Sequence, residues 1–152
     1  MAIKIGDLCS DFEAMNQHGE SIRLSDYKNS KNVVLFFYPK DETAGCTKEV
    51  CSFRDSYEDF VSLGSEVIGI SSDSHGSHQN FASKHNLNFH ILSDPKGLIR
   101  KSFGVPSRFF GLIPGRVTYI IDKEGRVKDI FENLFEAELH IRNAMDVLRK
   151  ME

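Results

Sequence analysis

The sequence predicts a mixed α/β fold in which helices cover both faces of a central sheet. Three observations lead to this prediction: continuous apolar runs typical of buried strands, amphipathic segments with helical spacing between them, and a late pair of strands separated only by a tight turn. The chain has 152 residues, which is the size of one domain. We therefore expect residues 1–152 to form a single domain around one core.

The composition narrows the classes of protein. Hydrophobic residues make up 40% of the chain and charged residues 27%, which is typical of a globular protein and excludes disorder. The formal charge of -3 lacks the basic excess that binds nucleic acid. The longest apolar run, residues 33–38, is too short to span a membrane, and residues 1–5 lack the apolar stretch of a signal peptide. We expect no nucleic acid or membrane partner and a cytoplasmic location, or a plastid if a transit peptide has been removed.

The first half of the chain predicts a hairpin and a strand, helix, strand unit. Residues 11–24 alternate weakly around a turn, which indicates a peripheral β-hairpin. Residues 32–38 form a β-branched and aromatic run closed by Pro39, as expected of a central strand buried on both faces. Residues 47–63 repeat apolar side chains every three to four positions, which predicts an amphipathic helix. Residues 66–71 form the next buried strand, and a crossover of this length makes the two strands parallel.

The second half predicts a helix, a short strand, a helical stretch, a hairpin and a final helix. We expect the helix at residues 77–85, the short strand at residues 89–92 and the helical stretch at residues 94–104. The two strands of the hairpin are expected at residues 116–121 and 127–131, and the final helix at residues 136–150. The tight turn at residues 122–125 makes the two strands of the hairpin antiparallel. This order of elements is that of a thioredoxin-like fold with an added N-terminal β-hairpin.

A polar loop after the first central strand leads to Cys46, at the expected start of a helix. The unpaired N–H groups and the positive end of the helix dipole favour an anion there, and a thiolate is the reactive form of cysteine. The loop also emerges beyond the carboxyl end of a strand, where α/β proteins bind ligands. The plainer alternative is a small buried residue that begins a core helix, as free cysteines often do.

A second cysteine, Cys51, follows five residues later and favours a redox role. On a helix the two residues lie roughly 7.5 Å apart along the axis and about 140° apart around it. A disulfide needs Cα atoms closer than about 7 Å, so Cys46 and Cys51 join only if the first helical turns unwind. This indicates a two-stage mechanism, in which Cys46 acts in a folded site and then meets Cys51 in a locally unfolded one. The spacing is neither that of a structural zinc site nor the Cys-x-x-Cys of a disulfide reductase.

These residues resemble the active-site motif of a known family. Pro39, Thr43 and Cys46 reproduce the Pro-x-x-x-Thr-x-x-Cys motif of peroxiredoxins. Cys46 together with Cys51 resembles the bacterioferritin comigratory protein, or peroxiredoxin Q, branch. The resemblance extends over nearly the whole chain, at residues 54–57, 66–71, 92–94 and 110–119. The last of these segments is most similar to plant and cyanobacterial members. We expect the protein to use neither a metal nor any other cofactor.

The resemblance implies a role for each motif residue. Cys46 is expected to be the peroxidatic nucleophile, which attacks hydrogen peroxide or an alkyl hydroperoxide and becomes a sulfenic acid. Cys51 is expected to resolve it as an intramolecular disulfide, which thioredoxin or a similar dithiol then reduces. Thr43 is expected to hydrogen-bond and orient the peroxide, the alternative being a hydroxyl that only caps the helix. Pro39, which has no N–H, is expected to shield the pocket from water.

Two charged residues complete the expected site. Arg116 matches the active-site arginine of the family, whose charge stabilises the thiolate and the charge that develops on the peroxide. A solvated arginine at the edge of a strand is the alternative. Glu49 lies one helical turn after Cys46, where a carboxylate disfavours the thiolate unless a cation balances it. We therefore expect Glu49 to pair with Arg116.

Several weaker signals stay open. Phe109 and Phe110 form either part of the core or a collar that favours alkyl hydroperoxides. Cys9 is a third thiol, which either competes with Cys51 to resolve the sulfenic acid or takes no part in the reaction. We expect it to take no part. His75 and His78 have a spacing that can bind a metal from one helical turn, although a surface pair is commoner.

Two other functions compete with a monomeric peroxidase. One is a redox-sensing binding protein, in which oxidation of Cys46 unwinds the helix and exposes a surface to a partner. Such a sensor needs one oxidation event, whereas an enzyme consumes many peroxides per chain. The other is a thioredoxin-like exchanger of protein disulfides, which the Cys-x4-Cys spacing disfavours.

Overall fold

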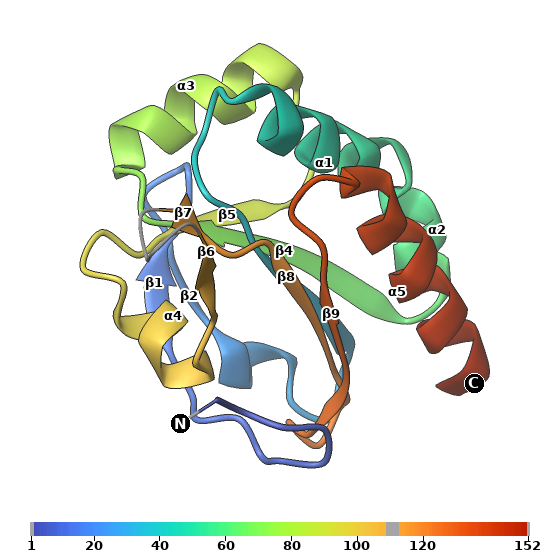
Figure 1. Ribbon diagram of the computed structural model, residues 1–152. Coiled ribbons are helices and arrows are strands. Elements are labelled where there is room, and N and C mark those ends of the chain that lie inside the picture. Colours follow the sequence, from blue (N-terminus) through green and yellow to red (C-terminus); the bar gives the residue numbers. More distant parts are fainter. Residues whose placement is uncertain (1, 109–112, 152) are drawn as a thin grey trace.

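Figure 1 shows the computed structural model, which describes residues 2–108 and 113–151. It is built on a five-stranded sheet with the strand order β5-β4-β3-β8-β9. The bounds of these strands are β3 (Asn32–Phe37), β4 (Ser65–Ser71), β5 (His90–Ser93), β8 (Val117–Ile121) and β9 (Val127–Glu132). β4 is parallel to both β3 and β5, whereas β8 is antiparallel to both β3 and β9. The mixed sheet predicted from the sequence is therefore confirmed.

The central strand β3 is buried on both faces, as its unbroken apolar run predicts. Successive side chains of a strand point to opposite faces of the sheet. Val34 and Phe36 accordingly join one hydrophobic core, and Leu35 and Phe37 join the other. None of the four is more than 2% exposed. Burial of their apolar side chains therefore stabilises the packing of the covering layers on both faces of the sheet.

Helices cover both faces of the sheet, again as predicted. One face carries α1 (Ala44–Asp55), α2 (Tyr57–Ser62), α3 (His75–His85) and α5 (Ala137–Met151). The other carries α4 (Leu98–Phe103), the 3-10 helix η1 (Leu24–Tyr27) and the hairpin of β1 (Glu13–Met15) and β2 (Ser21–Arg23). Figure 1 shows α1, α2 and α5 on one side of the sheet, and α4 with the hairpin on the other. The hairpin expected from residues 11–24 is thus present.

The single helix predicted over residues 47–63 is instead two helices. α1 begins earlier than predicted, at Ala44, and Ser56 takes φ -100° and ψ 3° between α1 and α2. Phe53 on α1 and Phe60 on α2 are both fully buried, and their ring centroids lie 5.7 Å apart. The apolar spacing therefore continues across the break, which is why periodicity alone did not reveal it.

Two local features also differ from the sequence prediction. The helical stretch predicted from residue 94 begins later, at Leu98, because Asp94 first makes a turn and its carboxylate accepts the N–H groups of Ile99 and Arg100. A small pair of antiparallel strands between α4 and β8 was not predicted. Its strands, β6 (Ser107–Arg108) and β7 (Ile113–Pro114), are two residues long each, which is too short for an alternation to be recognised.

The register of the sheet brings two distant segments together at one end. Phe37, the last residue of β3, is paired with Val117, the first residue of β8. The loop that follows β3 therefore meets Arg116, the residue before β8. This is the end of the sheet at which the sequence-predicted site residues gather.

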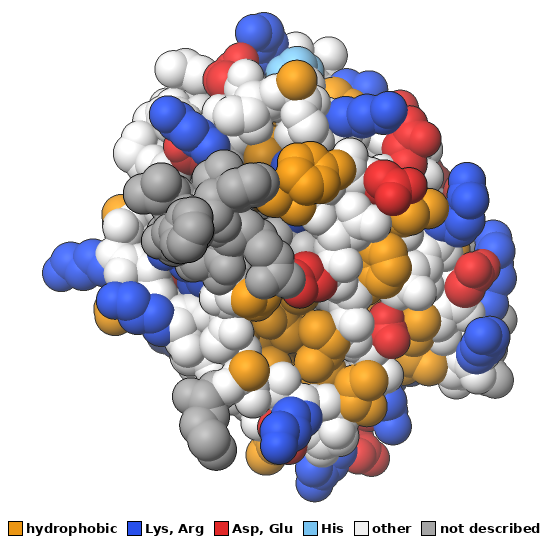
Figure 2. Space-filling model, in the orientation of Figure 1, with side chains coloured by type: hydrophobic (Ala, Val, Ile, Leu, Met, Phe, Trp, Pro, Cys, Tyr) orange, Lys and Arg blue, Asp and Glu red, His pale blue; other side chains and the backbone are white. Residues whose placement is uncertain are grey.

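The surface is mixed in charge. Figure 2 shows basic and acidic side chains interspersed over one face of the molecule, in keeping with the formal charge of -3. Across residues 2–108 and 113–151, none of the helices combines the length and apolarity that a membrane span requires.

Candidate active site

Cys46 lies in the first turn of α1, as predicted, at the end of the loop that follows β3. It is the third helical residue after the N-cap Thr43, it is free of any disulfide, and it is 1% exposed. The first N–H groups of a helix have no intrahelical partner and carry the positive end of the dipole. The sulfur of Cys46 therefore lies at the positive end of the α1 dipole.

Arg116 directs its guanidinium at the sulfur of Cys46. Its Nη2 donates to Cys46 Sγ at 3.2 Å, and its Nη1 donates to Glu49 Oε1 at 2.7 Å. Its Nε donates to the carbonyl of Leu134 at 3.1 Å, so three nitrogens hold the group in place. Burial opposes the charge, but the negative charges of Glu49 and Cys46 outweigh burial and raise the pKa of Arg116. The residue is 4% exposed, so the alternative of a solvated strand-edge arginine is wrong.

Gly45 allows the guanidinium to approach α1 this closely. A Cβ placed on Gly45 would lie 3.2 Å from Nη2 of Arg116, which is tighter than ordinary van der Waals contact. Nη2 is the atom that donates to Cys46 Sγ. A side chain at this position would therefore push this guanidinium nitrogen by a few tenths of an ångström.

Glu49 is completely buried and forms the ion pair with Arg116 that we expected from the sequence. Burial raises the pKa of this carboxyl to about 7, and the positive charge of Arg116 opposes that shift. Its second oxygen, Oε2, accepts no hydrogen bond within the described part of the chain. Nδ1 of His140 lies 3.6 Å from Oε2, which is too long for a hydrogen bond. The carboxyl thus shares one guanidinium with the thiol and takes up a proton near neutral pH.

His140 on α5 supports the site, although the sequence analysis did not select it. A carbonyl only accepts, so His140 Nε2 donates to the carbonyl of Asn133 at 2.7 Å, and Nδ1 faces the hydroxyl of Thr118 at 2.7 Å. Burial lowers the pKa of His140 to about 4, so the ring is neutral and Nδ1 accepts from Thr118. The ring thereby holds the segment whose next residue, Leu134, accepts from Arg116. A histidine on the apolar stripe of the C-terminal helix was the signal that could have found it.

Thr43 and Pro39 lie in the segment between β3 and Cys46. The hydroxyl of Thr43 donates to the carbonyl of Lys40 at 2.9 Å and makes no hydrogen bond to the N–H groups of α1. The alternative of a side-chain helix cap is therefore wrong. A hydroxyl that donates to a carbonyl keeps its lone pairs available to accept, and Thr43 is exposed to solvent. Pro39 is half-buried at the end of β3.

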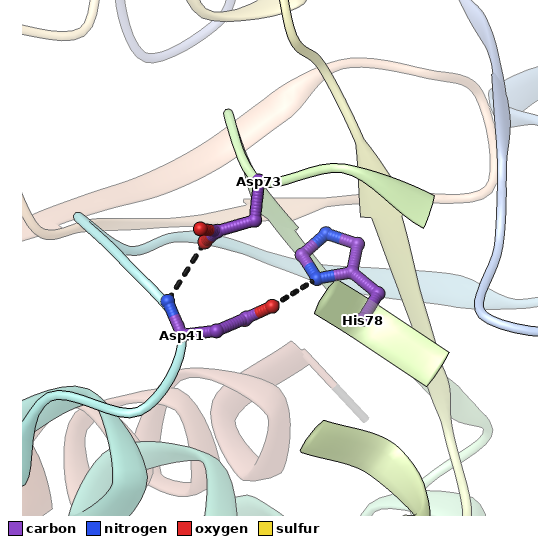
Figure 3. Close-up of side chains that lie close together, drawn as sticks. All are labelled: Asp41, Asp73 and His78. Atoms are coloured by element: carbon purple, nitrogen blue, oxygen red, sulfur yellow. Dashed lines mark hydrogen bonds and ion pairs between the residues drawn. The ribbon is translucent and has the colours of Figure 1, made fainter. Parts of the chain in front are cut away.

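Asp41, in the loop before α1, lies at the centre of a buried hydrogen-bond network (Figure 3). Its carboxylate accepts from the hydroxyl of Tyr38 at 2.6 Å and lies 2.7 Å from His78 Nδ1. Its backbone N–H donates to Asp73 Oδ2 at 2.7 Å. Nε2 of His78 donates to the carbonyl of Leu92 at 2.9 Å. Asp41 and His78 are 3% and 0% exposed, so they form a buried pair joined through one proton.

Two carboxylates and an imidazole in one cluster are groups that bind metals, and their ligand atoms lie within 4.8 Å of one another. Each of these atoms already has a hydrogen-bond partner, since hydroxyls of Ser77 and Ser71 also donate to the two carboxylates. Both ring nitrogens of His78 are already engaged, Nδ1 with the Asp41 carboxylate and Nε2 with the carbonyl of Leu92. His75 instead bonds the carbonyl of Asn16 at 3.0 Å, so the two histidines do not converge. The network anchors the loop before α1 to α3 and to the end of β4.

Cys51 lies on α1, half-buried, with its Sγ 3.7 Å from Nδ1 of His85 on α3. Because Cys51 and Cys46 are both within the regular helix α1, the two thiols do not meet without unwinding. Phe109 and Phe110, expected as core or collar, lie outside the described residues.

Cys9 lies apart from this site. It lines a cavity of about 130 Å³ together with Val33 and Ile121, which are at the opposite end of the sheet from the loop that carries Cys46. Burial, with the negative charges of Asp122 and Asp7, raises the pKa of Cys9 to about 11. The structure therefore brings together Cys46, Glu49 and Arg116 but not Cys9.

Comparisons with known proteins extend these observations. Residues 5–130 match the family described as AhpC/TSA. The chain is 47% identical to the chloroplastic peroxiredoxin Q of Triticum aestivum over 146 residues, which cover 96% of this chain and 67% of that protein. It is 49% identical to the chloroplastic peroxiredoxin Q of Sedum lineare over 140 residues, which cover 92% of this chain and 75% of that protein.

Solved structures agree in fold. Peroxidoxin BcpB of Mycobacterium tuberculosis matches with a TM-score of 0.91 and 36% identity, and the match covers 99% of both chains. The bacterioferritin comigratory protein of Xanthomonas campestris, studied for its alkyl peroxide reduction activity, matches with a TM-score of 0.84 and 26% identity. That match covers 92% of this chain and 91% of the other.

The fold and the site define a thioredoxin-like thiol protein, with a buried cysteine held by an arginine at the start of a helix. With these relatives, the chain belongs to the AhpC/TSA family, in its peroxiredoxin Q and bacterioferritin comigratory protein branch. The relatives support a thiol peroxidase activity for it.

Proposed function

We propose that the chain reduces peroxides through Cys46 as the peroxidatic nucleophile. The observation that carries the proposal is the 3.2 Å hydrogen bond from Arg116 Nη2 to Cys46 Sγ in the first turn of α1. A guanidinium and a helix N-terminus together favour the thiolate, which is the nucleophilic form. Cys46 is only 1% exposed, which suits small substrates such as hydrogen peroxide and the head group of an alkyl hydroperoxide.

In the first step, the thiolate of Cys46 attacks the terminal oxygen of the peroxide. A bond forms between Sγ and this oxygen, the O–O bond breaks, and the second oxygen takes up a proton and leaves as water or an alcohol. Cys46 becomes a sulfenic acid. Thr43 orients the peroxide through the lone pairs of its hydroxyl, Arg116 stabilises the charge that develops on the oxygens, and Pro39 limits the access of water.

In the second step, Cys51 resolves the sulfenic acid. The first turns of α1 unwind, the sulfur of Cys51 attacks the sulfur of Cys46, the S–O bond breaks, and water leaves as the disulfide forms. Thioredoxin or a similar dithiol protein then reduces the disulfide by thiol–disulfide exchange, and α1 folds again.

The test is to add one equivalent of hydrogen peroxide to the reduced protein and to measure intact and peptide masses, beside Cys46→Ser and Cys51→Ser variants. We expect a loss of two hydrogens that maps to Cys46 and Cys51. Both variants should lack this link, and Cys51→Ser should instead carry oxidised Cys46. A protein that stays reduced, or a link through Cys9 or between chains, would overturn the assignment.

A redox-sensing binding protein is the competing function. It is favoured by the burial of Cys46, since oxidation that unwinds α1 would expose new surface. Turnover separates the two functions. With thioredoxin, its reductase and excess peroxide, an enzyme consumes many equivalents of peroxide per chain, whereas a sensor consumes one. An exchanger of protein disulfides would instead reduce a protein disulfide when no peroxide is present.

Assembly and location are part of the same proposal. An intramolecular disulfide needs no second chain, so we propose a monomer, which sedimentation of the reduced and oxidised forms would test. The named plant relatives are chloroplastic, which favours the plastid alternative over the cytoplasm. Imaging of a C-terminal fluorescent fusion in the source cells distinguishes the two locations.

A further inference from the structure

Cys51 has a partner that the reaction above does not use. Its Sγ lies 3.7 Å from Nδ1 of His85, the last residue of α3, which is within reach of a hydrogen bond to sulfur. The other ring nitrogen, Nε2, is buried and has no hydrogen-bond partner within residues 2–108 and 113–151. The edge of the ring packs against Phe81, with centroids 5.0 Å apart and planes at 75°. The imidazole is therefore held by packing, and its one polar contact in the described chain is a thiol.

The half of α1 that carries Cys51 is tied to its surroundings. Phe53 is fully buried, and its ring stacks on Phe36 of the central strand with centroids 4.3 Å apart. Arg54 Nη1 donates to the carbonyl of His85 at 2.7 Å and so fastens this half of the helix to the end of α3. The opposite end of α1 begins with exposed Ala44 and Gly45 and lacks a side-chain cap, although Cys46 itself is buried and bonded to Arg116. We take unwinding to start at this uncapped end, so that Cys51 stays beside His85.

We propose that His85 is the general base of the resolving step, an inference that rests on the proposed role of Cys51. Nδ1 of His85 takes the proton from the thiol of Cys51, and the thiolate attacks the sulfenic sulfur of Cys46. The S–S bond forms as the S–O bond breaks. The departing hydroxide takes the proton back from the imidazolium and leaves as water, so atoms and charge balance. Arg54, which pairs with Asp55 on the same turn, adds a positive charge near the thiolate.

Two substitutions of His85 distinguish its proposed role as a base from its role in packing. His85→Phe keeps a ring against Phe81 and removes both nitrogens. His85→Asn keeps a hydrogen-bonding group near the position of Nδ1 but is no base. His18→Asn is the matched control, because His18 is exposed on the N-terminal hairpin turn. Circular dichroism and thermal melting establish that each variant is folded.

The experiment measures two rates after mixing reduced protein with hydrogen peroxide: loss of peroxide, and formation of the Cys46–Cys51 disulfide by acid quench and mass spectrometry. Both His85 variants should consume the first equivalent of peroxide at the unchanged rate. Disulfide formation should slow about tenfold or more, because an unassisted thiol is only a few per cent ionised near neutral pH. With peroxide in excess, a second equivalent should oxidise the persisting sulfenic acid of Cys46 to sulfinic acid. In a Cys46→Ser background, alkylation of Cys51 should slow by a similar factor.

The outcomes distinguish this inference from the function it rests on. If the unsubstituted chain forms no Cys46–Cys51 disulfide, the proposed role of Cys51 fails and that of His85 with it. If that disulfide forms and the His85 variants form it at the same rate, only the base assignment is wrong. A slowing of both steps together would also overturn it, because it would mean that His85 acts only on the fold. Equal slowing of disulfide formation in the His18→Asn control would overturn it too, because the effect would not be specific to His85.

Discussion

Glu49 accepts a 2.7 Å hydrogen bond from Arg116, although 67 residues separate the two along the chain. The same guanidinium reaches the sulfur of Cys46 at 3.2 Å, so a carboxyl and a thiol share one buried cation. Burial raises the pKa of Glu49 to about 7, and the charge left for the sulfur therefore changes near neutral pH. The first two predictions follow from this shared cation.

Removing the arginine should impair both activity and stability. Arg116→Met should lower the rate constant for reaction with hydrogen peroxide by about 10²–10³-fold, as when one preorganised donor is lost from an active site. It also leaves Glu49 buried without its cation, so the free energy of unfolding should fall by about 3–5 kcal/mol. Adding Glu49→Gln to this variant should restore stability but not activity. Stopped-flow kinetics and denaturant unfolding measure the two effects, and restored activity would contradict the role of the charge.

Removing the charge of Glu49 should raise the reactivity of Cys46 at and above neutral pH, where the carboxyl is otherwise ionised. As pH falls through about 7, the carboxyl gains a proton and the guanidinium acts on the sulfur alone. Glu49→Gln keeps a hydrogen-bond acceptor but carries no charge, so the component of the pH–rate profile centred near 7 should disappear. The measurement is the rate of alkylation of Cys46 from acid to mildly alkaline pH, on both sides of pH 7. Superimposable profiles for the two proteins would show that the carboxyl does not act on the thiol.

Breaking the anchor of the active-site loop should affect stability and substrate binding together. His78→Phe leaves the Asp41 carboxylate buried without its imidazole, so the free energy of unfolding should fall by about 3–5 kcal/mol. The loop that carries Thr43 should loosen and the KM for peroxide should rise. His75→Phe is the control, because this half-buried histidine on the same helix does not contact Asp41. Equal effects of both substitutions would rule out a specific anchor.

Cys9 should be a bystander in the reaction. With its pKa raised to about 11, only about one thiol in 10⁴ is ionised at pH 7, and thiolate is the reactive form. Cys9→Ala should therefore leave both turnover and the Cys46–Cys51 disulfide unchanged, and Cys9 should be alkylated last of the three cysteines. Steady-state kinetics and timed alkylation with peptide mapping test this. Appearance of Cys9 in a disulfide after one equivalent of peroxide would contradict it.

His140 should make stability depend on pH in the acid range. Burial lowers its pKa to about 4, below the ordinary 6.5, so its contribution is fully present above pH 6.5 and is lost as pH falls through about 4. The difference in unfolding free energy between the unchanged chain and His140→Phe should thus shrink by about 3 kcal/mol over that range. Glu49 titrates in the same range with the opposite sign, so the difference, rather than either curve alone, is the test. A constant difference would show that the ring does not titrate as proposed.

Much of the fold was predictable because its signals are local. The apolar run of β3, the three-to-four-residue spacing of the helices and the tight turn between β8 and β9 each follow from neighbouring residues. The break at Ser56 was missed because the apolar spacing continues on both sides of it. The pairing of β6 with β7 was missed because two residues show no alternation.

The active-site features likewise divide into those that the local sequence predicts and those that it does not. The motif of Thr43, Cys46 and Cys51, and the place of Cys46 at a helix start, are properties of one short segment and can be inferred from it. The network of Asp41 with His78 and the support of Arg116 by His140 escaped sequence analysis. Asp41 and His78 are 37 residues apart in the chain. His140 supports Arg116 only indirectly, through Asn133 and its neighbour Leu134. The local sequence around a histidine in a core helix does not reveal either role.

The sequence by itself determined which elements form and which thiol lies at the positive end of a helix, because propensity, periodicity and capping act between near neighbours. Tertiary structure decided how close the charges of Arg116 and Glu49 come to that thiol and how completely they are buried. The pairing of Phe37 with Val117 delivers Arg116 to Cys46 across 70 residues, and burial then sets the protonation of Glu49 and His140. Electrostatic interactions in a buried site depend on distance and on exclusion of water, and neither quantity exists until the helices have packed on the sheet.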